Sequence, residues 1–400
     1  MPPIPRPVRL LGLVSLFTDA ATEVIYPLLP VYLSRVLGAS AVSLGVIEGI
    51  AEGVNSLLKV ISGWWSDRQG KRRPIVILGY VLSSGARPLI AVTSTWTQVL
   101  AIRVLDRTGK GIRGAPRDAM LNRLADATSR GRIFGFHRAM DHTGAIIGPI
   151  IATVFLYFLP GEYRLLFALT AIPGALAVAT LFLVEEPATP RSVDAPDDAA
   201  RASQPATGNR ATPLPSALVV VLGIILLFSL GNSADAFLLL RLTDALGGAT
   251  YVPLLWAGLH VVKASLSTWG GSLSDRLGRA RVIALGWAIY ALVYLGFATD
   301  SSGLTYVILF LVYGVHFALA EGAEKALVAD LTPAGRLGLA FGLYNAALGI
   351  GAMLASVAFG VLYDRFGPSV AFGSGATLAA VAAALLLTIR THTGIVNRGT

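Results

Sequence analysis

The sequence predicts an all-α membrane protein with twelve transmembrane helices in two pseudo-symmetric six-helix bundles. Hydrophobic residues make up 54% of the 400-residue chain and charged residues 14%, with a mean hydropathy of +0.67. That composition is typical of a chain that crosses a bilayer. The charged stretch GWWSDRQGKRR (residues 63–73) returns as GGSLSDRLGRAR (residues 270–281). Asp67 and Asp275 lie about 208 residues apart, which indicates two copies of one membrane unit.

Twelve apolar stretches are long enough to cross roughly 30 Å of hydrocarbon, which takes about 20 helical residues. In chain order the expected helices cover residues 8–36, 42–66, 74–94, 97–120, 133–158, 163–184, 216–241, 251–274, 281–299, 303–328, 336–362 and 369–390. We do not interpret the first as a cleaved signal, because Asp19 and Glu23 interrupt it and it continues through Pro27 and Pro30.

The one long hydrophilic stretch divides the chain. Residues 185–215 are rich in Ala, Pro, Asp, Ser and Thr and contain almost nothing that could form a core. We expect a flexible cytoplasmic linker there. The predicted units are an N-terminal bundle at residues 1–184, the linker, and a C-terminal bundle with a short tail at residues 216–400.

Basic residues are distributed unequally between the breaks that separate these helices. With the N-terminus inside, the inner breaks hold about 19 Lys and Arg and the outer breaks about four, as the positive-inside rule requires. We therefore expect a multi-pass protein of the cytoplasmic (inner) membrane with both termini in the cytoplasm. The same clustering accounts for the net charge of +9, so nucleic acid is not an expected partner. The chain has no cysteine, which excludes disulfides and thiolate metal sites.

The duplication extends beyond the charged stretch. Gly135 and Gly144 correspond to Gly342 and Gly351 at an offset of about 207, and DATSRGR from residue 126 corresponds to DLTPAGR from residue 330. Three agreements at nearly one offset support an internal repeat.

The duplicated stretch resembles the signature of the major facilitator superfamily of secondary transporters, and the resemblance covers the whole chain. The positions that match this signature between the second and third helices are Gly63, Asp67, Arg68, Gly70, Lys71 and Arg72, and those of the second copy are Asp275, Arg276, Gly278 and Arg279. The resemblance implies the twelve-helix fold of that superfamily and assigns the stretch to gating.

Two further helices carry motifs of the same superfamily. In the fourth, Arg107, Gly111 and Gly114 match an RxxxGxxG pattern, with Lys110 where glutamine is frequent. The fifth follows the glycine ladder that the superfamily associates with antiporters, through Gly135, Gly144, Gly148 and Pro149, although Ala152 and Thr153 replace its terminal glycine pair. The second half has Ala355 and Ser356 at the Gly-Pro position. The resemblance therefore implies a drug/proton antiporter-like exporter.

The signature has a physical interpretation as a latch. The carboxylate of Asp67 can pair with nearby arginines or with the N-terminus of a neighbouring helix. We expect such contacts only when the cytoplasmic side is closed, where they favour the outward-facing state by a few kcal/mol. The positive-inside rule explains Arg72 and Arg73 equally well. The glycines allow close helix approach and Pro149 bends its helix, although ordinary small-residue packing also explains them.

Charges inside the expected helices are the main candidates for function, because each costs on the order of 3 kcal/mol near the bilayer centre. A proton carrier is a carboxylate or histidine that titrates near neutral pH and faces the cavity. The candidates for proton coupling are Asp19, Glu23, Glu48, Glu52 and Asp141. The alternative is a fixed network of ion pairs, for example between an acid of the first two helices and Arg107. We expect the coupling chemistry in the first half.

Bases and other polar residues share these helix faces. The candidates for substrate binding are Tyr26, Lys59, Arg87, Arg103, Arg107, Lys110, Asn232, Asp235, His316 and Glu321. Their mixed charge, with strong bases on the fourth helix, favours a polar, anionic or zwitterionic solute. His137, Asp141, His142 and His316 are too scattered to predict a metal site, and we expect no cofactor apart from the coupling ion, H+.

The sequence thus predicts a monomeric secondary transporter that moves a small solute by alternating access, and not an enzyme. There is no GxxxxGK[ST] nucleotide-binding loop, so an ion gradient is the expected energy source. Proton-coupled efflux is the first hypothesis. The second is a proton-coupled importer of an organic anion that binds Arg107, Lys110 and Arg87. A polytopic membrane enzyme using His137, Asp141 and His142 as acid-base groups is a third, against which the duplicated gating stretch argues.

Overall fold

The structure, a computed structural model, describes residues 4–69, 72–124, 130–185, 214–333 and 336–388, and every regular element in these ranges is helical. In chain order the elements are α1 (Arg6–Ile25), η1 (Tyr26–Leu28), α2 (Leu29–Val31), η2 (Tyr32–Val36), α3 (Ala41–Gln69), α4 (Arg73–Ala86), η3 (Arg87–Val92), α5 (Trp96–Arg123), α6 (Arg130–Phe158), α7 (Tyr163–Leu169), α8 (Ala171–Phe182), α10 (Ser216–Gly231), α11 (Ala236–Ala245), α12 (Val252–Leu277), α13 (Arg279–Ala298), α14 (Gly303–Asp330) and α15 (Leu337–Thr388).

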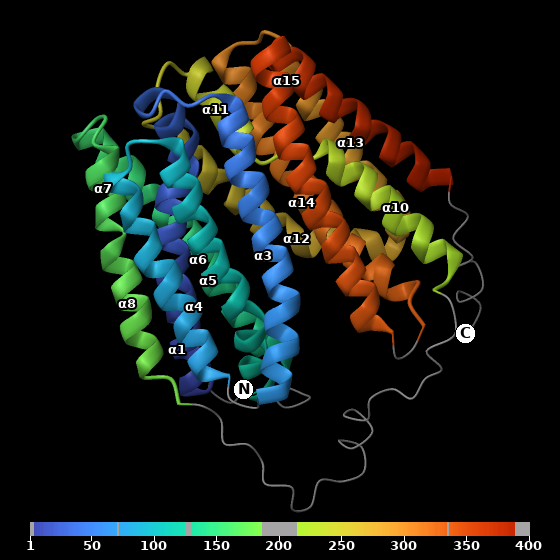
Figure 1. The fold of residues 1–400 in the computed structure, drawn as a ribbon. Coiled ribbons are helices and arrows are strands. Elements are labelled where there is room, and N and C mark those ends of the chain that lie inside the picture. Colours follow the sequence, from blue (N-terminus) through green and yellow to red (C-terminus); the bar gives the residue numbers. More distant parts are fainter. Residues whose placement is uncertain (1–3, 70–71, 125–129, 186–213, 334–335, 389–400) are drawn as a thin grey trace, which may run out of the picture.

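The helices form two halves that lie side by side (Figure 1). The first half holds α1 to α8, in which α1 packs against α6 and α8, and α5 packs against α3 and α4. The second half holds α10 to α15, in which α15 contacts α10 and α13, and α14 contacts α12 and α13. The halves meet along two helix pairs, α3 with α15 and α6 with α12.

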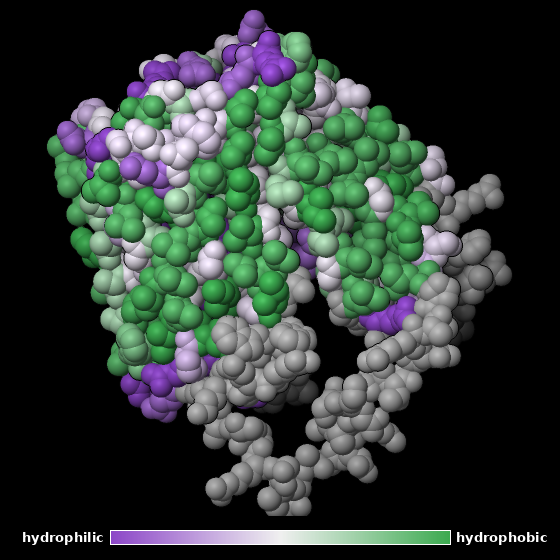
Figure 2. Space-filling model, viewed as in Figure 1, coloured by the Kyte–Doolittle hydropathy of each residue, from purple (hydrophilic) through white to green (hydrophobic). Residues whose placement is uncertain are grey.

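The surface confirms the expected membrane setting. Figure 2 shows a broad apolar band around the visible face, with hydrophilic residues gathered at the two ends. Eight helices in the described ranges are long and apolar enough to cross a membrane, and one of them, Leu339–Thr388, turns at Gly367 and supplies two of the expected spans. Helices α1, α5 and α12 supply the others. These three carry intramembrane charges such as Glu23, Arg107 and Lys263, and they line the site described below.

One expected helix is broken. A continuous helix at residues 216–241 was the prediction, but α10 ends at Gly231 and α11 begins only at Ala236. Asn232, with φ −96° and ψ 85°, leaves the helical region. The run Gly-Asn-Ser at 231–233 explains the break, since glycine and asparagine favour non-helical backbone and local side-chain hydrogen bonds.

A glycine turn separates the last two predicted helices, which run together as α15. At Gly367 the backbone takes φ 83° and ψ 172°, and Pro368 follows. Glycine adopts a positive φ without the steric cost that other residues meet there. The chain therefore reverses direction here with no intervening loop.

Two glycines of α6 let it approach α1 closely. A Cβ added at Gly144 would overlap the carbonyl oxygen of Leu16, and one added at Gly148 would overlap that of Ala20. A Cβ at Gly135 would meet no atom within 4 Å. Close approach therefore depends on two of the three predicted glycines, and Pro149 follows inside the same helix.

Gly148→Ala is expected to destabilise the protein by about 1–3 kcal/mol, because its methyl group would push α6 away from the backbone of α1. Gly135→Ala is the matched control and should be neutral or slightly stabilising, since alanine is the better helix former. Thermal unfolding of the two purified variants in one detergent measures the difference. Equal melting temperatures would show that the close approach is unimportant for stability.

Candidate functional site

Two cavities between the halves join into one space. The first, about 450 Å³, is lined by residues of α3, α10, α14 and α15, and the second, about 420 Å³, adds residues of α1, η1, α5 and α12. Glu52, Asn232, Phe317 and Ala352 line both. We call the joined space the central cavity.

The central cavity reaches toward one end of the molecule. We call this the linker end, because α8 ends and α10 begins there, and we call the opposite end, where α15 turns, the loop end. Figure 2 shows the halves apart at the linker end. Lining residues such as Lys59 and Lys325 lie in the parts of α3 and α14 that run toward this end.

Contacts between the halves close the loop end. The carboxylate of Asp364 accepts hydrogen bonds from the backbone N–H groups of Ala41 and Val42, each at 2.9 Å. Arg35 and Asp244 form an exposed ion pair across the halves at 3.0 Å. Two close backbone approaches accompany these contacts, between Gly45 and Ser356 and between Gly360 and Ala41.

Below this closure the floor of the cavity is aromatic. The rings of Tyr26 and Trp256 lie 5.0 Å apart between centroids, and Trp256 Nε1 donates a hydrogen bond of 2.7 Å to Glu23. This contact joins α1 and its continuation η1 to α12. Sequence reasoning missed Trp256, because a tryptophan in an apolar helix gives no signal of function by itself.

The structure brings most of the predicted site residues to the central cavity. The substrate candidates that line it are Tyr26, Lys59, Arg107, Lys110, Asn232, Asp235, His316 and Glu321, and the proton-coupling candidates that line it are Glu23, Glu48 and Glu52. Arg87, Arg103, Asp19 and Asp141 are not among its lining residues.

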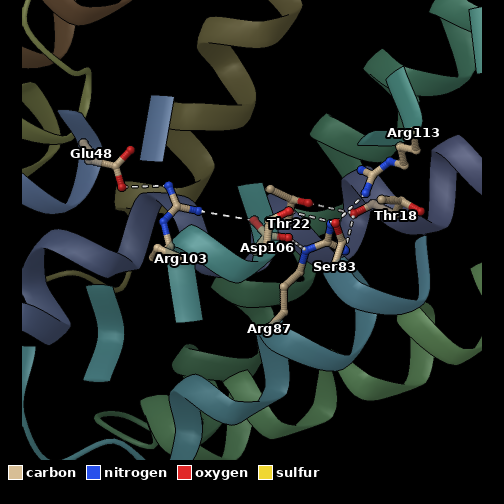
Figure 3. A network of polar contacts seen from close by, with 8 residues as sticks. All are labelled: Thr18, Thr22, Glu48, Ser83, Arg87, Arg103, Asp106 and Arg113. Carbon is tan, nitrogen blue, oxygen red and sulfur yellow. Dashed lines mark hydrogen bonds and ion pairs between the residues drawn. The ribbon is translucent and has the colours of Figure 1, made fainter. Parts of the chain in front are cut away.

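A buried network in the first half engages Arg87 and Arg103 (Figure 3). Arg103 bonds Glu48 at 2.7 Å, and its other terminal nitrogen lies 3.7 Å from Asp106. Arg87 bonds Asp106 at 3.0 Å and donates to the carbonyl oxygen of Thr18. These two predicted substrate ligands therefore tie α1, α3, α5 and η3 together.

The network continues along α5 toward the linker end. Arg113 donates to the hydroxyl of Ser83 at 2.5 Å, and Ser83 donates to the carbonyl oxygen of Asp106. The guanidinium of Arg113 also lies 4.3 Å from the ring centroid of Tyr80. Arg113 is thus a third buried arginine in this network, and it joins α5 to α4.

Asp19 and Asp141 belong to the contact between α1 and α6. Asp141 accepts a hydrogen bond from Ser15 and lies 3.5 Å from Nδ1 of His137. Asp19 stands beside Gly144, the glycine that lets the two helices approach. His137 is buried, so its pairing with Asp141 lies inside the bundle rather than on the cavity wall.

The acids and the bases of the second cavity differ in their partners. Each acid has a hydrogen-bond donor: Trp256 for Glu23, Arg103 for Glu48, Asn55 for Glu52, and Tyr313 for Asp235. Arg107, Lys110 and Lys263 form no side-chain hydrogen bond or ion pair with any residue in the described ranges. The unused hydrogen-bonding capacity of this cavity is therefore cationic.

The break between α10 and α11 opens onto the cavity. Asn232, Ser233, Ala234 and Asp235 all line it. Neighbouring side chains satisfy the freed backbone groups, since Tyr290 donates to the carbonyl oxygen of Gly231 and Ser356 accepts from the N–H of Ala234. Unwound backbone at membrane depth is tolerated where protein or a cavity covers it.

Glu324 is a lining residue that was not among the predicted sites. It is buried and accepts hydrogen bonds from Trp287 at 2.9 Å and from Tyr344 at 3.0 Å. The signal was present in the sequence as a carboxylate in an apolar helix, but the neighbouring pair Glu321 and Lys325 obscured it.

The other predicted residues of α14 are already engaged. Glu321 pairs with Lys325 at 3.0 Å and lies 3.6 Å from Arg138 of the first half. His316 is buried, with Nδ1 3.0 Å from the carbonyl oxygen of Gly286. Both residues still present part of their surface to the cavity.

The first gating stretch lies mostly outside the described residues. Gly63, Asp67 and Arg68 lie in the last turns of α3, where the structure describes the backbone but not the side chains. Gly70 and Lys71 lie outside the described residues. Arg72 occupies the N-cap position of α4, and it has an interaction partner.

The second gating stretch makes its contacts within one half. Arg279 pairs with Asp275, lies 3.4 Å from Asp330 and donates to Ser274 at 2.7 Å. These residues all belong to the second half, and the contacts exist while the linker end is open. In this copy the contacts do not depend on closure of the linker end, because the ionic partners of Arg279 lie in its own half. The expectation for Asp67 stays a prediction, because its side chain is outside the described residues. Arg276 precedes the turn, and Gly278 takes φ 93° at the end of α12.

Arg279→Ala is expected to cost at most about 1 kcal/mol of stability, because both of its carboxylate partners are partly exposed and solvent screens such pairs. Thermal unfolding at low and high salt tests this. A loss well above that value, unchanged by salt, would mean that the contact is a principal support of the second half.

Comparison with known proteins places the chain in a family. The sequence profile of the Major Facilitator Superfamily matches residues 11–258 and 221–399. An uncharacterized MFS-type transporter of Methanocaldococcus jannaschii is 32% identical over 394 residues, which cover 96% of this chain and 94% of that protein. Multidrug resistance protein MdtH of Photorhabdus laumondii is 29% identical over 136 residues, 34% of this chain and 33% of that protein.

The fold agrees with this assignment. The crystal structure of a POT family transporter in complex with 5-aminolevulinic acid matches with a TM-score of 0.78 over 96% of each chain, at 14% identity. A likeness at that identity shows the fold alone, whereas the profile match covers nearly the whole sequence. The chain belongs to the Major Facilitator Superfamily and is a multi-pass membrane transporter of small molecules, not an enzyme.

Proposed function

We propose that this protein exports a small polar solute from the cytoplasm in exchange for protons. Its two bundles, residues 1–184 and 216–400, rock about the central cavity, and one chain holds a complete cavity, so a monomer suffices. The observation that carries the proposal is the cavity itself: it lies between the halves, is closed at the loop end, opens toward the linker end, and is lined by carboxylates such as Glu23, Glu52 and Asp235.

The proposed orientation places the linker end and both termini in the cytoplasm. The basic residues of the interhelical breaks concentrate at this end, as the positive-inside rule requires. The structure then corresponds to an inward-open conformation. The first gating stretch, around Asp67, would join the halves at this end only after they close.

Two observations support export over import. Gly144 and Gly148, which belong to the antiporter-type ladder of α6, form the tight contact with α1. The partial relative MdtH is named a multidrug resistance protein.

Glu23 and Glu52 are the proposed proton carriers. Each faces the cavity and accepts a hydrogen bond from a neutral donor rather than from a cation, Glu23 from Trp256 and Glu52 from Asn55. Glu48 differs, because it accepts its hydrogen bond from the cation Arg103 as part of a fixed network. A proton and a solute can therefore compete for the same space.

Everted membrane vesicles test the proposal. Vesicles with an acidic lumen, prepared with and without the protein, are incubated in a cell extract, and mass spectrometry identifies solutes that accumulate only with the protein. Accumulation that collapses when the pH gradient is dissipated supports proton-coupled export. Uptake only by right-side-out vesicles with an acidic exterior would instead establish the importer.

Carboxylate variants separate coupling from transport. Glu23→Gln and Glu52→Gln are expected to lose accumulation driven by the pH gradient while keeping solute exchange at equal pH, because exchange needs no net proton movement. Glu162→Gln, an exposed carboxylate at the loop end, should behave as the unaltered protein. Retained gradient-driven accumulation in both cavity variants would remove them as carriers.

A further inference from the structure

We infer that the central cavity holds an oxyanion group of its solute, a carboxylate or phosphate, between Arg107 and Lys110 of the first half and Lys263 of the second. This inference rests on the proposed transport of a solute through this cavity, and it depends neither on direction nor on proton coupling. Lys263 was not among the predicted ligands.

Arg107 is the strongest element of this site. It is 7% exposed, lines the cavity, and its Nε has no hydrogen-bond partner in the described ranges. Carboxylates of Asp106, Glu52 and Glu48 act on it only at longer range. A buried guanidinium with free donors is costly unless a ligand satisfies it, and its planar fork matches a carboxylate or phosphate.

The neighbouring arginine on α5 provides a comparison, because carboxylates pair with it. Arg103, one helical turn away on α5, bonds Glu48 at 2.7 Å and lies 3.7 Å from Asp106. Its charge is therefore paired, although its Nε, like that of Arg107, has no hydrogen-bond partner in the described ranges. Lys110, the next turn in the other direction, and Lys263 of α12 line the same cavity as Arg107. Lys263 holds its ammonium 3.6 Å from the ring centroid of Phe317, and it donates to no carboxylate in the described ranges.

The site draws bases from both halves, which gives it a role in the transport cycle. An oxyanion that contacts α5 and α12 together bridges the two bundles. Removing either base weakens binding. A solute that makes more of these contacts in one conformation than in the other shifts the equilibrium between the two conformations. The cavity volume of about 420 Å³ suits a small metabolite.

A thermal-shift panel on protein in lipid nanodiscs tests the site at constant pH and ionic strength. The probes are inorganic phosphate, glucose 6-phosphate, succinate and glutamate, with glucose and choline as neutral and cationic comparisons. We expect one or more oxyanion probes to raise the melting temperature, and Arg107→Gln and Lys263→Gln to weaken that binding at least about tenfold. Phosphate-only or carboxylate-only responses identify which oxyanion is preferred.

Two controls separate binding from folding. Without ligand, Arg107→Gln should melt at the same or a higher temperature, because it removes a buried charge with no bonded partner, whereas Arg103→Gln should melt lower. Arg164→Gln, outside the cavity at the loop end, should keep the probe response. Any of three results would refute the site: stabilisation by glucose or choline alone, no response to any oxyanion, or an oxyanion response that is unchanged in both cavity variants. Oxyanion binding without export in vesicles leaves the site standing and refutes only the proton-coupled exporter.

A second observation concerns the loop end. The gating stretch has a third copy, GVLYDRFG at residues 360–367, which repeats the G-x-L-x-D-R-x-G spacing of GSLSDRLG at 271–278. The final glycines share a backbone conformation, with φ 93° at Gly278 and φ 83° at Gly367. The geometry points to this copy as the latch that keeps the loop end closed.

The carboxylate of this third copy already makes the contact that the sequence assigned to Asp67. Asp364 accepts both of the 2.9 Å hydrogen bonds from Ala41 and Val42 at the start of the 29-residue helix α3. A negative charge at this position satisfies free N–H groups and the helix dipole. A Cβ at Gly360 would lie 2.6 Å from the carbonyl oxygen of Ala41, so the glycine brings the acid within reach.

The latch joins the two halves and must break when the loop end opens. It therefore stabilises the conformation seen here over the one open at the loop end. Because a carboxylate that accepts two charge-assisted hydrogen bonds is lost, Asp364→Ala is expected to raise the ratio of loop-end-open to loop-end-closed protein at least about tenfold. Asp364→Asn, which retains one acceptor oxygen, should be intermediate.

Distances across the loop end test the latch. The chain has no native cysteine, so spin labels at Thr97→Cys of the first half and Tyr251→Cys of the second report on this end alone by pulsed EPR. Asp300→Ala is the control, since Asp300 lies at the same end but pairs with Arg241 of its own half. A long-distance population that grows only in the Asp364 variants supports the latch. Identical distributions in Asp364→Ala and the unaltered protein refute it.

Discussion

Asp106→Ala is expected to destabilise the protein by about 3–5 kcal/mol, the largest loss of stability among these predictions. Arg87 and Asp106 are each 4% exposed and joined at 3.0 Å, so the substitution leaves a guanidinium buried without its carboxylate. Arg103 keeps Glu48 and loses only its longer contact. Thermal unfolding in a single detergent measures the effect.

The control for that prediction is a solvent-exposed ion pair of similar length. Asp300 bonds Arg241 at 2.8 Å but is 98% exposed. Asp300→Ala should cost about 0–1 kcal/mol, because solvent screens the pair. Equal losses in the two variants would mean that burial does not set the strength of the first-half network.

Gly45→Val is expected to abolish the loop-end-closed conformation and, with it, transport. A Cβ at Gly45 would overlap the backbone carbonyl oxygen of Ser356, and backbone on both sides leaves no flexible side chain to move aside. Since α3 and α15 form this contact across the halves, the added bulk acts as a wedge at the loop end. Pulsed EPR with the Thr97→Cys and Tyr251→Cys labels should show the longer distance as the dominant population.

Gly85→Ala provides the comparison, because a Cβ there meets no atom within 4 Å. It should keep the distance distribution and the transport of the unaltered protein. Transport by Gly45→Val at the original rate would show that the halves do not need this contact to complete the cycle.

Helix α5 carries two kinds of arginine, one paired with carboxylates and one that faces the cavity. Arg103 and Arg107 both lie on α5 and on the same side of it by spacing, and sequence reasoning assigned both to the substrate. The structure gives Arg103 two acids and leaves Arg107 facing the cavity. Helical periodicity predicts which face a residue occupies, but the counter-charge comes from another helix, and Glu48 is 55 residues away in the chain.

The sequence alone was sufficient for the all-helical architecture, the positions of the predicted spans to within a few residues for most helices, and the set of charged faces. These features are local, because hydrophobic length and residue spacing express them directly. It also supplied the superfamily signature. The break at residues 232–235 was signalled only weakly, by Gly231 and Asn232, because tertiary contacts from Tyr290 and Ser356 stabilise the unwound backbone.

What only the tertiary structure decided is how the charges pair and which end of the cavity is closed. Asp364 falls in the predicted break between the last two helices, so no intramembrane cost marks it in the sequence. Its carboxylate nevertheless binds the start of a helix from the other half. Arg107 and Lys263 lie in different bundles and share a cavity only once those bundles meet. Such contacts depend on the packing of helices far apart in the chain, whereas the helices themselves follow from the residues within each span.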